Sequence, residues 1–167
     1  PARIARDNTP HLPVLQHAVQ WLKDHEEYTP DAVMILQPTA PLRQAFHIRE
    51  AADLMQKTGA DSVVSVSAVP EHFNPHWQFS MDGSGRIKVF TGEPFARIIG
   101  RRQDLPKTYF RNGAIYLFKT GLLFDPAAPS FYGADVAGYI MDEQYSVNID
   151  TMDDWDKAER ILVSGRK

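Results

Sequence analysis

Two polar side chains near the end of the chain have the spacing of a metal site. In Asn148-Ile149-Asp150 the amide and the carboxylate point the same way if the segment is extended, because side chains alternate along a strand. Oxygen ligands of this kind suit Mg²⁺, which often takes only one or two carboxylates together with substrate phosphates. The tripeptide therefore predicts a magnesium site made by Asn148 and Asp150, with helix capping as the alternative role of Asp150.

A second candidate is the loop 37–43, which contains two prolines and follows an apolar run at 32–36. Open α/β sheets place ligands just beyond the carboxyl ends of their strands. The amide of Gln37, the hydroxyl of Thr39 and the guanidinium of Arg43 could hold a polyhydroxylated acid there. The alternative interpretation is a rigid, proline-stiffened connection with a surface arginine.

Arg101, Arg102 and the Arg111 of Arg111-Asn112 have guanidinium groups with paired N–H donors. A guanidinium can bind a carboxylate through two parallel hydrogen bonds, and the aromatic pair 131–132 could supply an apolar wall beside it. Both features have an alternative interpretation, because arginines also occur as solvated surface residues and aromatics as core residues.

The composition argues against several other kinds of site. The chain has no cysteine, which excludes disulfides, thiolate chemistry and cysteine-ligated zinc. His72 and His76 straddle Asn74-Pro75, which prevents a regular helical pair of metal ligands. No Gly-x-Ser-x-Gly, Gly-x-Gly-x-x-Gly or Walker-type loop occurs, so serine hydrolysis, dinucleotide binding and ATP hydrolysis have no motif behind them.

Length and charge set the broad class. A chain of 167 residues that is 43% hydrophobic and 23% charged predicts one globular domain over 1–167. Its net charge of −3 gives no electrostatic reason to bind a nucleic acid polymer or an anionic membrane. No apolar run approaches the roughly 20 residues of a membrane helix and no signal-peptide pattern is visible, so we expect a cytoplasmic protein.

The elements that must position these residues alternate between helix and strand. Apolar spacing predicts a helix over 12–24, a strand over 32–36, a helix over 48–59 and a strand over 62–67. The last three form a βαβ unit in which 32–36 is expected to be a central parallel strand. We therefore expect an α/β fold with a mainly parallel sheet.

The middle of the chain has a different pattern. Polarity alternates on both sides of the glycine turn 82–85, which predicts an inserted β-hairpin over 77–90. Further strands are predicted at 114–118 and 138–141. The capping box at 151–154 predicts the start of a final helix.

Three motifs taken together resemble those of the acylneuraminate cytidylyltransferases, or CMP-sialic acid synthetases. They are LQPTAPLR at 36–43, YFRNGAIY at 109–116 and SVNIDT at 146–151, and their order and rough spacing also match. The similarity extends from PARIARD at 1–7 to the final helix. It implies a three-layer, Rossmann-like nucleotidyltransferase fold.

This resemblance implies transfer of CMP from CTP to the anomeric hydroxyl of a nonulosonic acid such as sialic acid, with Mg²⁺ assistance and release of pyrophosphate. It implies that Asp150, with Asn148, is the catalytic metal ligand. The region 77–107 resembles the family's dimerisation arm, so a homodimer is implied. The implied substrate-binding residues are Gln37, Arg102, Arg111, Asn112, Gly113, Phe131 and Tyr132.

Departures from the family pattern bear on activity. The family's glycine- and basic-rich loop, which grips the CTP phosphates, has no counterpart here, and Asn148 stands where the family commonly has aspartate. Without that loop we expect poor turnover from this chain alone, because the donors that stabilise the leaving pyrophosphate are missing. The alternative function is a non-catalytic, dimerising module that binds a sugar acid or a nucleotide.

Overall fold

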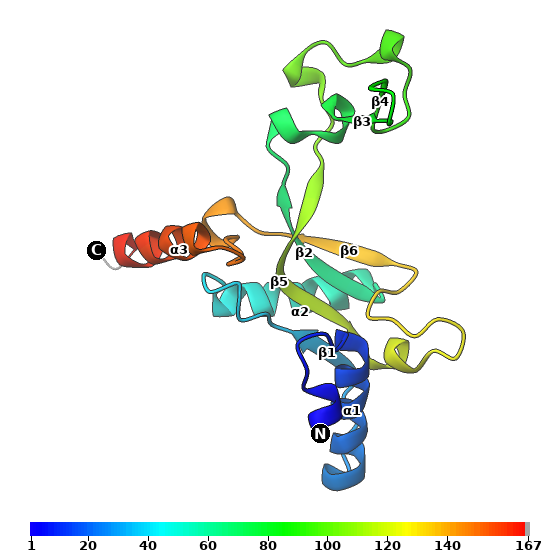
Figure 1. The fold of residues 1–167 in the computed structure, drawn as a ribbon. Helices are drawn as coiled ribbons and strands as arrows, with labels where there is room; N and C mark the ends of the chain where they lie inside the picture. Colours follow the sequence, from blue (N-terminus) through cyan, green and yellow to red (C-terminus); the bar gives the residue numbers. More distant parts are fainter. Residues whose placement is uncertain (166–167) are drawn as a thin grey trace.

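The chain folds around a mixed main sheet with helices on both faces. In the computed structural model, which describes residues 1–165, the main sheet has strand order β1-β5-β2-β6, and a separate hairpin pairs β3 with β4 (Figure 1). The helices are α1 (His11–Glu26), α2 (Ala45–Thr58) and α3 (Met152–Ser164). The strands are β1 (Ala32–Ile35), β2 (Ser62–Ala68), β3 (Phe79–Met81), β4 (Ile87–Val89), β5 (Tyr109–Lys119) and β6 (Val136–Ile140).

Short 3-10 helices connect these elements. Their bounds are Ala2–Ile4, Glu71–Phe73, Pro75–Trp77, Phe95–Arg97, Arg102–Asp104, Thr120–Phe124 and Glu143–Tyr145.

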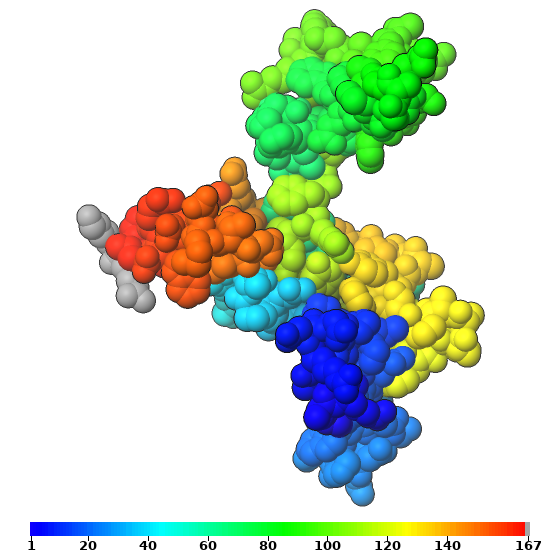
Figure 2. All heavy atoms as spheres, viewed as in Figure 1, coloured from blue at the N-terminus to red at the C-terminus, as the bar shows by residue number. Residues whose placement is uncertain are grey.

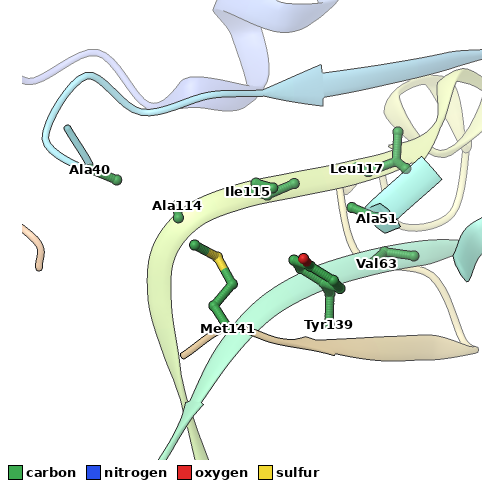
Figure 3. Packing of buried hydrophobic residues seen from close by; sticks show 8 residues of the cluster. All are labelled: Ala40, Ala51, Val63, Ala114, Ile115, Leu117, Tyr139 and Met141. Atoms are coloured by element: carbon green, nitrogen blue, oxygen red, sulfur yellow. The ribbon is translucent and has the colours of Figure 1, made fainter. Parts of the chain in front are cut away.

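Alternating side chains of the sheet build two cores, one on each face. On one face, Val33 and Phe118 pack with Val19 of α1. On the other face, Leu117 packs with Val63 and with Ala51 of α2, as the close view of this core shows (Figure 3). Successive residues of a strand point to opposite faces, so neighbouring apolar residues serve different helices. The arrangement is α1, sheet, α2, which is consistent with a Rossmann-like layering.

The helices predicted from apolar spacing are confirmed. The second ends at Gly59, whose φ of 73° is the left-handed conformation that glycine adopts at little cost. The final helix begins after Thr151, whose side chain accepts a hydrogen bond from the backbone N–H of Asp154 in a capping box.

Two expectations about the sheet were wrong. The sheet is not mainly parallel in its pairing, because β5 is antiparallel to both β1 and β2 and only β2 and β6 pair in parallel. The reason is topological: the chain leaves along β2, traverses the segment 69–108 and returns along β5. Also, β1 is an edge strand within the described sheet. The continuous apolar run of β1 indicates that both faces of the strand pack against other residues. A strand at the edge of a sheet can meet this condition as well as a central strand.

The segment 69–108, which we call the arm, projects away from the sheet. Figure 2 shows it as a separate lobe joined to the rest of the molecule by a narrow neck, and the backbone N–H of Val69 closes its base by donating to the carbonyl of Thr108. The predicted hairpin lies inside it, with Phe79 opposite Val89. Its proposed role in dimerisation stays a prediction.

Candidate functional site

A cavity of about 520 Å³ lies where the amino-terminal end of α1 meets β1 and β5. It is on the α1 face of the sheet, and segments far apart in the sequence contribute to its wall. Predicted site residues that line it are Gln37, Arg111, Asn112, Gly113, Phe131, Tyr132, Asn148 and Asp150; the other lining residues are His11, Ile35, Phe110, Tyr116 and Ser146.

The loop that carries Gln37 is fastened to the sheet by Arg43. The Arg43 guanidinium donates to the carbonyl of Gln37 at 3.0 Å and to the carbonyl of Ala114 at 2.8 Å. Burial lowers the pKa of Arg43 below its ordinary value. Arg43 is not among the residues that line the cavity. The idea that its guanidinium meets a ligand is therefore replaced by a structural role, with Gln37 as the polar side chain that the loop presents.

An irregularity in β5 shapes the cavity floor. Val64 pairs with Tyr116 but Val66 pairs with Arg111, so β5 contains more residues than β2 over this interval. Gly113 lies in the irregularity with a φ of 76°, a conformation that other residues adopt only with strain. The strand prediction of 114–118 missed this part because a bulge interrupts the alternation on which the prediction depends.

The Asn112 side chain is buried beneath the cavity, with 4% of its surface exposed. Its Oδ1 accepts from the Ser65 hydroxyl at 2.6 Å and from the backbone N–H of Ala114 at 3.2 Å. Its Nδ2 donates to the hydroxyls of Ser67 at 3.1 Å and Ser146 at 3.2 Å. This set of hydrogen bonds ties β5 to β2 and to the segment that precedes Asn148.

Asn148 and Asp150 lie together on the cavity wall, as their spacing predicted. The amide Nδ2 of Asn148 donates to a carboxylate oxygen of Asp150 at 2.7 Å. The helix-capping alternative for Asp150 is wrong, because Thr151 is the N-cap and Asp154 supplies the carboxylate of the capping box. The carboxylate of Asp154 also accepts from the backbone N–H of Asp150 at 3.2 Å. The Asp150 carboxylate is thus left to face the cavity.

An aromatic and cationic cluster forms another part of the wall. Phe131 and Tyr132 pack with their ring centroids 4.8 Å apart, and Tyr116 contacts both edge-on. The pKa of Arg111 is raised by its hydrogen bond with Tyr132, and burial raises the pKa of Tyr116. A guanidinium at the wall of a cavity can bind a carboxylate or phosphate group.

Arg102 is not part of this cavity. It lies in the arm, where its exposed side chain pairs with Glu71. The prediction that it lines the same pocket as Gln37 therefore does not hold within this chain.

Sequence reasoning missed His11 and Ile35. His11 is the first residue of α1, and a helix amino terminus carries partial positive charge that favours anions nearby. His11 belongs to no recognisable local pattern, and Ile35 was predicted only as part of the apolar strand 32–36. Only the packing of α1 beside β1 brings them to the cavity, so no sequence signal could have found them.

The donor set at Asn148 and Asp150 is sparse for a metal. Within residues 1–165 there is no group of three or more histidine, aspartate or glutamate side chains that could hold an ion. One carboxylate and one amide oxygen fit Mg²⁺ when substrate phosphates complete its coordination, and do not fit a site made by protein alone.

Comparison with known proteins finds relatives that are similar over most of this chain. The chain is 28% identical over 152 residues to the N-acylneuraminate cytidylyltransferase of Streptococcus agalactiae, covering 91% of this chain and 34% of that protein. It is 32% identical over 133 residues to the CMP-N,N'-diacetyllegionaminic acid synthase of Legionella pneumophila, covering 79% and 54% respectively. It is 26% identical over 161 residues to the post-translational flagellin modification protein B of Campylobacter coli, covering 96% and 65%.

The names of these relatives agree with the resemblance drawn from the motifs at 36–43, 109–116 and 146–151. The chain is therefore similar, over most of its length, to N-acylneuraminate cytidylyltransferases and to a CMP-N,N'-diacetyllegionaminic acid synthase. It spans between about a third and two thirds of the length of these relatives. No family model matches it. Within residues 1–165, no helix has the length and apolar character needed to cross a membrane.

Proposed function

We propose that this chain provides the sugar-acid and metal side of a cytidylyltransferase site and takes part in the transfer of CMP from CTP to a nonulosonic acid. The anomeric hydroxyl oxygen of the sugar acid would bond to the α-phosphorus of CTP. The bond from that phosphorus to the β-phosphate oxygen would break, pyrophosphate would leave, and the hydroxyl proton would pass to solvent. The observation that carries this proposal is the convergence of three separate motifs on one cavity.

Each wall of the cavity suits one part of the substrates. Arg111 with Tyr132 would bind the carboxylate of the sugar acid, and Gln37 would bind its hydroxyls. Phe131 would pack against the apolar side of the ring. His11 at the amino terminus of α1 would lie near the phosphates, since that end of the helix favours anions.

Asp150 and Asn148 would hold Mg²⁺ together with the phosphates of CTP. When bound, the ion would withdraw negative charge from the phosphoryl oxygens. The chain's own contribution is the placement of Asp150. The Asp154 carboxylate accepts from the Asp150 backbone N–H, and the Asp150 carboxylate accepts only from the Asn148 amide within the described residues. The preference for Mg²⁺ over other divalent ions rests on this oxygen donor set.

The test is a pyrophosphate-release assay with CTP, Mg²⁺ and N-acetylneuraminic acid. We expect release that depends on all three, and Asp150→Asn is expected to lower it on the order of a hundredfold, by analogy with the loss of one charge-stabilising group. The matched control is Asp153→Asn, which removes an exposed carboxylate from the first turn of α3. Equal activity of Asp150→Asn and the wild-type chain would contradict the assignment.

The alternative, a non-catalytic module, is favoured by one observation: within residues 1–165 Asp150 is the only acidic residue that lines the cavity. Calorimetric titration distinguishes the two functions. Binding of N-acetylneuraminic acid or CTP without any pyrophosphate release would identify the module.

The arm is proposed to mediate a homodimer and to bring Arg102 to the partner's cavity. Its support is that Arg102 lies outside the cavity of its own subunit while the arm projects from the sheet (Figure 1). A cytoplasmic location is proposed with the same family in mind.

A further inference from the structure

We propose that Asn112 is a positioning residue that shapes the cavity from below and does not bind the ligand through its side chain. This inference rests on the proposed function for the meaning of the cavity. Its basis is a count of hydrogen bonds. A side-chain amide has two N–H donors and two acceptor lone pairs on its oxygen. All four are used within the protein, by Ser65, Ala114, Ser67 and Ser146.

The orientation of the Asn112 amide is fixed by its neighbours. The backbone N–H of Ala114 can only donate, so the atom facing it must be Oδ1. The Ser146 hydroxyl gives its proton to the carbonyl of Asp142 at 2.8 Å, so it accepts from Nδ2. Rotating the amide to meet a ligand would break both contacts at once and leave buried groups without partners.

Ser65 and Ser67 hold this amide in place from the neighbouring strand. Ser65 is fully buried and also accepts from the backbone N–H of Ile115 at 2.7 Å. Ser67 is 3% exposed. Neither serine lines the cavity, yet both bind the residue at the centre of the β5 irregularity. Through Asn112 they set the backbone on which Arg111 and Gly113 are mounted.

The same hydrogen bonds reach the proposed metal side of the cavity. Ser146 is two residues before Asn148, and the Asn148 Oδ1 lies against Gly113, at 3.5 Å from where a β-carbon on that glycine would be. A glycine at this position lets the Asn148 segment approach β5 closely. The position of Asn148 and Asp150 relative to Arg111 therefore depends on Asn112.

The test uses serine variants that do not touch the cavity. Ser67→Ala and Ser65→Ala in the full chain are expected to shift the backbone NMR resonances of Gly113, Ala114 and Asn148. They are also expected to weaken the binding of N-acetylneuraminic acid, measured by calorimetry, by about tenfold, the scale found when groups that orient ligating residues are removed.

Two control variants separate positioning from loss of stability. Thr120→Val removes a buried hydroxyl that has no hydrogen-bond partner within the described residues. Leu54→Ala weakens the packing of α2 against the core that contains Val63 and Leu117. Both are expected to retain the wild-type resonances of Gly113 and Asn148 and the wild-type affinity.

Two results would overturn the inference. One is wild-type resonances and affinity in both serine variants together with lost binding in Asn112→Ala, which would make Asn112 a direct ligand contact. The other is unchanged exchange of the Ala114 amide proton with solvent in Asn112→Ala. If the wild-type chain binds neither N-acetylneuraminic acid nor CTP, the proposed function fails, and the resonance shifts still decide whether Asn112 positions Gly113 and Asn148.

Discussion

At the scale of single residues, Asp150, Thr151 and Asp154 have different roles at the start of α3. Thr151 and Asp154 satisfy the backbone groups at the start of α3, and the Asp150 carboxylate accepts only from the Asn148 amide within the described residues. Hydrogen bonds from the Thr151 hydroxyl and from nearby backbone N–H groups lower the pKa of Asp154. Asp150 and Asp154 thus have different roles because different groups donate hydrogen bonds to their carboxylates.

Gly113→Ala is expected to destabilise the chain by roughly 1–2 kcal/mol, because the φ of 76° is a left-handed conformation that other residues adopt with strain. Steric overlap is a minor cause, since the added carbon would be 3.5 Å from Asn148. Urea unfolding followed by circular dichroism measures the change. Gly83→Ala is the control, because the φ of Gly83 is outside the left-handed region and there is open space where its β-carbon would be. Equal stability of the two variants would contradict the explanation.

His47 is expected to make folding stability depend on pH. The residue is 2% exposed and its Nδ1 accepts from the backbone N–H of Gln44 at 2.9 Å, which requires a neutral ring. Burial lowers its pKa below the ordinary 6.5, opposed by the charges of Glu50 and Asp142 and assisted by Arg43.

Because the unfolded chain binds the proton more readily, this contribution to stability is complete above pH 6.5 and is lost as the pH falls through the lowered folded pKa. Unfolding free energies measured by urea titration should therefore decrease below that pH. His47→Gln keeps an acceptor for the Gln44 N–H but does not titrate, so its profile should be flatter. Parallel profiles for both proteins would exclude His47 as the cause.

At the scale of elements, α3 depends on its first turn. Its exposed face includes Met152 and Trp155, and its packing rests on Ala158 with Leu42 and Val147. The helix also packs through the partly buried Ile161, and its N-cap adds to this by giving an acceptor to a backbone N–H of the first turn.

Thr151→Ala is expected to lower the unfolding free energy by about 1 kcal/mol, since the N–H of Asp154 loses its acceptor. Thr151→Ser retains the hydroxyl and should retain most of the stability. Both values come from urea unfolding monitored by tryptophan fluorescence, to which Trp155 in α3 contributes together with Trp21 and Trp77. A Ser variant as weak as the Ala variant would mean that the threonine methyl group, and not the cap, is responsible.

At the scale of the whole molecule, the arm exposes more apolar surface than its small hairpin can bury. Figure 2 shows it separated from the sheet and helices by the neck. Large contiguous apolar surfaces on soluble proteins commonly mark interaction sites. The exposed apolar residues of the arm are Phe73, Phe79, Met81, Ile87, Phe90, Phe95 and Ile98.

We expect the wild-type chain to sediment as a dimer and Phe90→Asp to sediment as a monomer, because Phe90 is 64% exposed in the arm and a charge would oppose its burial against a partner. Tyr28→Asp places the same charge at a site that is 56% exposed outside the arm and should remain dimeric. Analytical ultracentrifugation gives the answer, and a monomeric wild-type chain would contradict the proposed role of the arm.

If Arg102 acts in the partner's cavity, mixing two variants of low activity should restore part of the lost activity. Arg102→Ala and Asp150→Asn chains, refolded together, would form some dimers in which one cavity has both an intact Arg102 and an intact Asp150. Pyrophosphate release from the mixture should exceed that of either variant alone. No recovery, despite mixed dimers in native mass spectrometry, would place Arg102 outside the site.

Several features of this protein follow from the sequence alone. The helices at α1 and α2, the β3–β4 hairpin and the capping box at Thr151 all depend on residues within a few positions of one another. Local spacing and turn chemistry are sufficient for them. The pairing of Asn148 with Asp150 was predicted for the same reason, since two residues two positions apart share a side of an extended segment.

Tertiary structure alone decided the direction of β5, the place of β1 at the edge of the sheet, and the partners of Asn112 and Arg43. Each depends on residues distant in the chain: Arg43 meets Ala114, and Asn112 meets Ser65 and Ser146. An apolar run shows which faces of a strand are covered, but the strand beside it is chosen by the path of the chain through the arm and back. Polar side chains that look available for a ligand in the sequence can therefore be fully used inside the fold.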